Sequence, residues 1–141
     1  MLRMTVLAFL GFVATTAGIA PAACTGADPA LTSVAVKSVT RANGINRYTL
    51  VGTVVNDGAQ AQASNVLQFV DISQTPGEKL DSKGIPPLKA GESSTFSYVL
   101  LRSAESGDGT TTLRFQLDMR QPAASGAADC NAGNDSFSVT F

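Results

Sequence analysis

Oxygen-bearing side chains gather before the last strand-like run, in the sequence ADCNAGND. Asp129, Asn131, Asn134 and Asp135 lie there, and Asp118 ends the preceding alternating run. Carboxylate and amide oxygens are the ligands that Ca²⁺ prefers, but the spacing is not that of an EF-hand, which needs Gly at position six and Glu at position twelve. Such side chains also cap turns by bonding to the local backbone. We therefore expect turn capping, with a weak calcium site at Asp118, Asp129, Asn131 and Asp135 as the alternative.

Two cysteines lie near opposite ends of the chain, Cys24 after an apolar leader and Cys130 in the Asn-rich turn. An even pair of cysteines in an exported chain predicts one disulfide bond, because the compartment beyond the membrane is oxidising. Closing a loop of roughly 100 residues stabilises a fold by about 4.7 kcal/mol in the chain-entropy treatment. The alternative is a lipid on Cys24, but Pro21 stands where bacterial lipoproteins usually carry a Leu-like residue. We favour the disulfide between Cys24 and Cys130.

Several kinds of catalytic chemistry are missing from the composition. The chain contains no His, which excludes Ser-His-Asp and Cys-His nucleophile arrangements and His-containing zinc sites, and two cysteines cannot form a Cys₄ site. The phosphate-binding and nucleophile motifs G-x-x-x-x-G-K-[ST], G-x-G-x-x-G and G-x-S-x-G are also missing. Composition does not exclude a Ser-Lys pair, although no signature supports one. We expect no enzymatic activity from this chain alone, and no cofactor.

Residues 1–23 have the layout of a secretory signal peptide. Arg3 precedes an apolar run from Met4 to Ala14, and Ala20-Pro21-Ala22 forms an A-x-A cleavage site. As a membrane anchor, this run would be short for a hydrocarbon core about 30 Å thick. We expect an exported protein, periplasmic, secreted or at the cell surface. Residues 24–141 would form one mature domain with no membrane span after cleavage.

Apolar and polar residues alternate through the mature chain with the period of a β-strand. TTLRFQLD is the clearest case, because Leu113, Phe115 and Leu117 share one face. RYTLVGTVVND, STFSYVLL and SFSVTF repeat the pattern, and LTSVAVKSV, NVLQFVDI and a short EKLDS complete the set. Gly- and Asx-containing turns such as Asn56-Asp57-Gly58 separate these runs. The fold class that follows is all-β, an immunoglobulin-like antiparallel β-sandwich of about seven strands.

Two segments indicate how the strands are arranged. NVLQFVDI is apolar over nearly its whole length, which predicts a central strand covered on both faces. Pro86 and Pro87 lack backbone donors, so their segment cannot be a central strand and should cross between the sheets. We expect Leu88 to fill the space beneath that crossing.

Four segments, in order along the chain, resemble the CARDB family, the cell-adhesion-related domains found in bacteria. They are DPALTSVAV, YTLVGTVVNDG, IPPLKAGESSTFSY and DCNAGNDSFSVTF, and the likeness covers Asp28–Phe141. The closing turn departs from the family pattern. In the family this turn usually carries more Glu, whereas here it contains Cys130 and follows a Gly/Ala-rich insertion. Modules of this family are small immunoglobulin-like sandwiches in exported or surface proteins. The resemblance therefore implies a binding or adhesion module.

The expected function is non-enzymatic binding or adhesion at the cell envelope or outside the cell, with a protein or glycan partner. Two alternatives are a structural subunit that self-associates into a surface layer or fibre, and a calcium-dependent binding module. The net charge is −1, with only 15% charged residues, so we expect no nucleic-acid partner.

Overall fold

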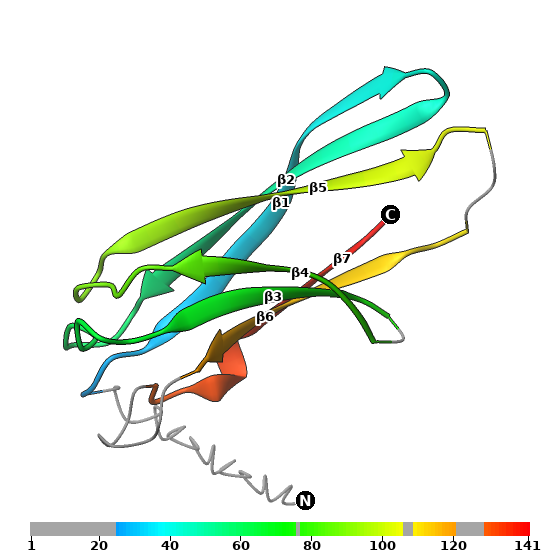
Figure 1. The fold of residues 1–141 in the computed structure, drawn as a ribbon. Helices are drawn as coiled ribbons and strands as arrows, with labels where there is room; N and C mark the ends of the chain where they lie inside the picture. Colours follow the sequence, from blue (N-terminus) through cyan, green and yellow to red (C-terminus); the bar gives the residue numbers. More distant parts are fainter. Residues whose placement is uncertain (1–24, 76, 106–108, 121–128) are drawn as a thin grey trace, which may run out of the picture.

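Two antiparallel β-sheets packed face to face make up the part of the chain that the computed structural model describes, residues 25–75, 77–105, 109–120 and 129–141 (Figure 1). One sheet has three strands and the other four, so the predicted seven-stranded β-sandwich is confirmed. The predicted signal peptide and Cys24 lie outside the described residues. Among those that are described, no helix is long and apolar enough to cross a membrane.

The sheets have the strand orders β1-β2-β5 and β4-β3-β6-β7. The three-stranded sheet contains β1 (Pro29–Ala42), β2 (Ile45–Asn56) and β5 (Ser93–Ser103). The four-stranded sheet contains β3 (Gln68–Gln74), β4 (Glu78–Ile85), β6 (Thr112–Met119) and β7 (Ser136–Thr140), and a single 3₁₀ turn, η1 (Ala132–Asn134), precedes β7. In the immunoglobulin constant-type order the fourth strand pairs with the fifth. Here β4 pairs with β3 instead, which leaves β5 at an edge.

The core lies between the sheets and follows the predicted alternation. Leu113, Phe115 and Leu117 of β6 are buried, and they meet Leu50 and the other inward residues of β2 and β5. The rings of Phe96 and Phe115 lie 6.0 Å apart across the core. Gly52 is required beneath the Phe96 ring, because a Cβ atom there would overlap it.

The predicted central position of β3 is confirmed, since it pairs with β4 and β6. The prediction that both faces of this strand are buried is wrong. Val70 and Ile72 are fully buried toward the core, whereas Phe69 and Asp71 on the outward face are partly exposed. The Arg120 guanidinium lies 4.3 Å from the Phe69 ring centre and bonds to Asp71, so a cation and an ion pair cover this face in place of a second apolar layer.

The predicted crossing between the sheets is also confirmed. Pro86 and Pro87 lie between β4 in one sheet and β5 in the other, and Leu88 is 2% exposed beneath the crossing. Two buried amides hold this segment. Gln62 and Gln68 exchange side-chain hydrogen bonds at 2.9 Å, and Gln62 also accepts the Leu88 N–H at 2.9 Å.

Asn56 ends β2 with a fully buried side chain that joins three segments. Its Oδ1 accepts the backbone N–H groups of Asp28 at 2.9 Å and Gly58 at 3.1 Å. Its Nδ2 donates to the carbonyl oxygens of Gln60 at 2.8 Å and Leu88 at 3.1 Å. The sequence predicted only that this residue begins a turn. The structure adds that its buried side chain joins three segments at the end of the sandwich where β1 begins.

Candidate functional site

The structure separates the predicted calcium ligands into two places. Asp118 lies on the outward face of the four-stranded sheet, where its carboxylate accepts a hydrogen bond from Arg120 Nε at 3.0 Å. Asp129 accepts the N–H of Asn131 at 2.9 Å, and Asn131 Oδ1 accepts the N–H of Gly133 at 3.3 Å at the start of η1. The capping of turns predicted for this segment is therefore observed.

Three acidic residues and one asparagine meet at the end of the sandwich where β1 begins, and we call them the acidic cluster: Asp28, Asp129, Asn134 and Asp135. Asp28 and Asp135 are each 7% exposed, and Asn134 Nδ2 donates to Asp28 Oδ1 at 3.1 Å. Among the described residues, Asp135 Oδ1 and Asn134 Oδ1 are buried without a hydrogen-bond partner. The cluster thus keeps two oxygen acceptors away from water.

Burial raises the pKa of Asp135 to about 7, and the charge of Asp129, a hydrogen bond with Asp129 and the charge of Asp28 act in the same direction. A carboxyl group with such a pKa is largely protonated in mildly acidic solution and loses its proton near neutrality. Within the described part of the chain, no three His, Cys, Asp or Glu side chains converge as metal ligands. A cation at this cluster would therefore need amide or backbone oxygens as well.

Sequence reasoning missed Asp28, and it named Asp118, whose carboxylate pairs with Arg120. Leu117 donates its N–H to the Asp135 carbonyl oxygen at 2.8 Å, so the end of β6 does return to the final turn as expected. Side chains alternate along a strand, and Leu117 is the buried neighbour, so Asp118 points to the opposite face from the core. Asp28 precedes a strand far away in the sequence, and its bond with Asn134 and its effect on Asp135 show that it belongs to the cluster.

Cys130 lies beside the start of the chain's first strand. Its backbone N–H donates to the Ala27 carbonyl oxygen at 3.3 Å, and its Sγ lies 3.3 Å from the same oxygen. Cys24, three residues before Ala27, is outside the described residues. The bond between Cys24 and Cys130 therefore stays a prediction.

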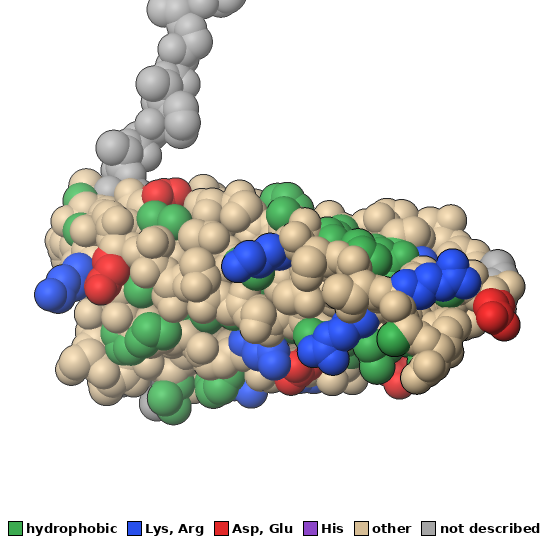
Figure 2. Space-filling model, turned by 90° about the horizontal axis from the view of Figure 1, so that it is seen from above, with side chains coloured by type: hydrophobic (Ala, Val, Ile, Leu, Met, Phe, Trp, Pro, Cys, Tyr) green, Lys and Arg blue, Asp and Glu red, His purple; other side chains and the backbone are tan. Residues whose placement is uncertain are grey.

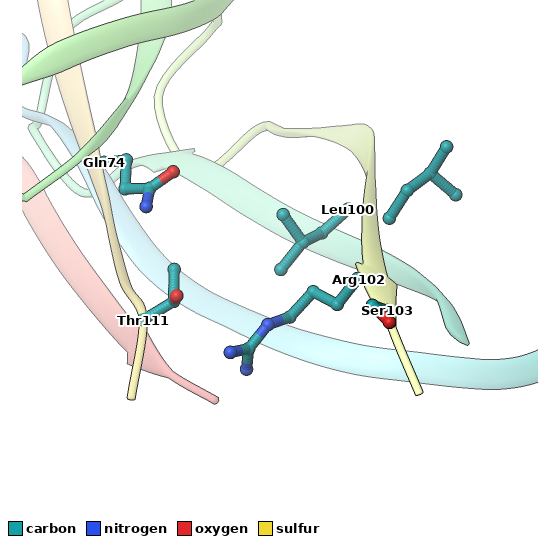
Figure 3. Close-up of a pocket in the computed structure, with 6 residues that line it drawn as sticks. Gln74, Leu100, Arg102, Ser103 and Thr111 are labelled. Carbon is teal, nitrogen blue, oxygen red and sulfur yellow. The ribbon is translucent and has the colours of Figure 1, made fainter. Parts of the chain in front are cut away.

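A cavity of about 370 Å³ opens at the opposite end of the sandwich (Figure 3). It is lined by Gln74, Leu100, Leu101, Arg102, Ser103 and Thr111. Arg102 Nη2 donates to the Gly109 carbonyl oxygen at 2.5 Å, so this guanidinium already ties the loop after β5 to its strand. The lining supplies amide, hydroxyl and guanidinium groups for hydrogen bonding. Among the described residues, the lining contains no carboxylate, thiol or amine that could act as a base or a nucleophile.

Three of the four edge strands carry features that block the addition of another strand. β1 has two register irregularities and the exposed charges of Lys37 and Arg41. β4 carries charges along its length, and its Asp81 and Lys83 form an ion pair at 2.7 Å. β7 is only five residues long. Charges, bulges and shortness are the usual protections of an edge.

β5 has none of these protections. It runs for eleven residues, pairs with β2 without a register shift, and contains one charged residue, Arg102. Seen from above, the surface carries scattered hydrophobic side chains among polar ones, with Lys, Arg, Asp and Glu side chains spread between them (Figure 2). Leu101, on the outward face of β5, is 59% exposed. Such an edge can accept another strand.

The hydrogen-bonding direction along β5 follows from its two ends. Ala104 donates its N–H to Gly44, and Asn56 donates to Glu92, so the even-numbered residues of this register bond to β2. The odd-numbered residues then point their N–H and C=O groups away from the sheet. These are Thr95, Ser97, Val99 and Leu101 in the middle of the strand, and no described backbone group outside the sheet bonds to them.

No protein-family model matches this sequence, and no curated protein is significantly similar to it. The resemblance to CARDB domains is therefore a prediction that neither comparison bears on.

Proposed function

We propose that this chain is an exported, non-enzymatic binding module that takes up an extended strand of a partner protein at the free edge of β5. One observation carries the proposal: β5 is a long edge strand with no register shift and a single charged residue, Arg102, while the other three edges are protected. The CARDB-like segments and the leader-like residues 1–23 support the same role.

The contacts available at this edge favour a protein partner over a glycan. An incoming strand would bond to the outward-pointing backbone groups of Thr95, Ser97, Val99 and Leu101, which gives affinity without a sequence requirement. Side chains of that strand would alternate between Leu101 on the outward face and Tyr98 on the inward face. Tyr98 lies near the Asp81–Lys83 ion pair of β4. Burial, together with the charge of Asp81, raises the pKa of its hydroxyl. Specificity would come from these two faces.

Replacing one backbone donor tests this proposal. Val99→Pro removes an outward-pointing N–H, whereas Val39→Pro makes the same change on the protected β1 edge, where Val39 pairs with Tyr48 and does not bond to β2. The probe is a displayed library of random twelve-residue peptides, selected on the immobilised protein. We expect selected peptides to lose binding to the Val99→Pro variant and to keep it for Val39→Pro. Equal binding to both variants would place the peptide site elsewhere.

The calcium-dependent module is a second candidate, favoured by the buried, unpartnered oxygens of Asn134 and Asp135. Two carboxylates and amide oxygens are hard ligands suited to Ca²⁺. A cation that binds only the folded state raises the melting temperature, and the rise grows with the logarithm of its concentration relative to its Kd. We expect millimolar Ca²⁺ to raise it for the wild-type protein and not for Asp135→Asn. An unchanged melting temperature in Ca²⁺ and in EDTA would dismiss this candidate.

Export predicts the chemical state of the cysteines. We propose that cleavage after residue 23 leaves Cys24 at the N-terminus and that it bonds to Cys130, joining the two ends of the mature chain. The position of Cys130 beside Ala27 supports this pairing. Mass spectrometry of the exported protein under non-reducing conditions should find one linked peptide pair. A lipid on Cys24, or two free thiols, would refute it.

A further inference from the structure

We propose that the strand taken up at the β5 edge is β5 of a second copy of this chain, which joins two three-stranded sheets into one continuous six-stranded sheet. This inference rests on the binding role proposed above for the same edge. It names the occupant of the edge and a register for it.

The register follows from the direction of the backbone groups. The odd-numbered residues of β5 point their N–H and C=O groups outward, so two copies can bond only if odd residues face odd residues. An antiparallel pair with its two-fold axis at Tyr98 meets this condition over the whole strand. Ser97 then faces Val99 of the second copy, and Thr95 faces Leu101. No other two-fold register overlaps all eleven residues.

This pairing also matches the side chains. Residues that face each other in an antiparallel pair lie on the same side of the sheet. The inward-facing Phe96 and Leu100 of the two copies would be neighbours, as would the two Tyr98 rings. On the outward face, the exposed Leu101 would be next to Thr95 of the second copy. Apolar groups therefore meet apolar or hydroxyl groups along the interface.

Charge favours a second copy at this edge and not at the others. The single cation of β5, Arg102, would face Ser94 of the second copy. The two Arg102 residues would be eight residues apart along the strand, or about 27 Å at 3.4 Å per residue. Self-pairing of β1 would instead bring the two cations of each copy, Lys37 and Arg41, into the interface, and self-pairing of β4 would bring its four charged side chains there. A two-fold contact uses up both β5 edges, so the assembly closes as a dimer and does not grow into a fibre.

Sedimentation velocity over a wide concentration range is the first test. We expect the purified protein to form dimers at high concentration, and Val99→Pro to weaken dimerisation at least tenfold. Val39→Pro should leave it unchanged. A wild-type protein that stays monomeric while peptides still bind at β5 would overturn this inference and leave the proposed function standing. Monomers that also bind no peptide would refute both.

A cysteine at the two-fold axis tests the register. Tyr98 belongs to the even-numbered set, so its two copies would form a non-hydrogen-bonded pair with Cα atoms about 4.5 Å apart, within the range for a disulfide. Under mild oxidation, Tyr98→Cys should give a covalent dimer on non-reducing gels, while Arg102→Cys should not. As a control, circular dichroism should show that both variants keep the strand signal. A covalent dimer of Arg102→Cys but not of Tyr98→Cys would show that this register is wrong.

Discussion

Raising the pH from 5 to 8 should destabilise this protein through a single carboxyl group, Asp135. Its pKa is raised in the folded state to about 7 from an ordinary value of 3.8. The folded state therefore binds more protons than the unfolded state between these two values. The resulting stabilisation is fully present below pH 3.8 and is lost as the pH rises through 7. Asp135→Asn keeps the shape of the side chain and removes the titration.

The size of the expected loss of stability follows from how far the pKa of Asp135 is raised. One pKa unit corresponds to about 1.36 kcal/mol, so a shift of this size would lower the free energy of unfolding by on the order of 3 kcal/mol between pH 5 and pH 8. Asp129, its half-exposed neighbour, is screened by solvent, which reduces the effect. We expect a loss of roughly 2 kcal/mol for the wild-type protein. Asp71 and Asp81 have lowered pKa values, so their contributions are lost only in stronger acid.

Urea unfolding followed by circular dichroism at pH 5, 6, 7 and 8, with EDTA present, measures this loss. The Asp135→Asn variant should match the wild-type protein at pH 5, exceed it at pH 8, and show a flat profile between them. Glu105→Gln removes an exposed carboxylate and should keep the wild-type slope. A wild-type profile that is flat, or a variant that is destabilised equally at every pH, would refute the reasoning.

The other predictions concern buried groups and can share a urea-unfolding assay. Asn56→Ala leaves four backbone partners unsatisfied and should lower the free energy of unfolding by about 3 kcal/mol or more, whereas an effect below about 1 kcal/mol would mean that water replaces the amide. Gly52→Ala forces a Cβ atom into the Phe96 ring and should cost about 1–3 kcal/mol, part of which Phe96→Leu should restore in the double variant. Phe115→Ala should cost about 3–5 kcal/mol, because the ring is fully buried.

The strands were predictable because alternation is a local property. Each inward face needs an apolar residue at every second position, and the sequence shows this directly at Leu113, Phe115 and Leu117. The crossing at Pro86 and Pro87 was predictable for a similar reason, since a residue without an N–H cannot serve in the middle of a sheet.

The acidic cluster was only half predictable, because it depends on contacts between distant segments. Asp129 and Asp135 were recognised from their shared turn, but Asp28 reaches them from the other end of the chain. Nothing local to Asn56 distinguishes a buried clamp from an ordinary Asn-Asp-Gly turn. Its role appears only when the segments around Asp28 and Leu88 pack against it.

The free edge of β5 could not be predicted at all, because it is a consequence of topology. Its sequence, SSTFSYVLLRS, is equally suited to a strand with neighbours on both sides. It becomes an edge because β4 pairs with β3, and the charges of β4 protect the edge that β4 occupies in the other sheet. The pairing of β4 with β3 therefore gives the four-stranded sheet a charged edge and leaves β5 as an edge strand of the three-stranded sheet. A long, uncharged and regular edge is an aggregation hazard unless something covers it. Closed two-fold pairing would remove the hazard with the same backbone groups that create it.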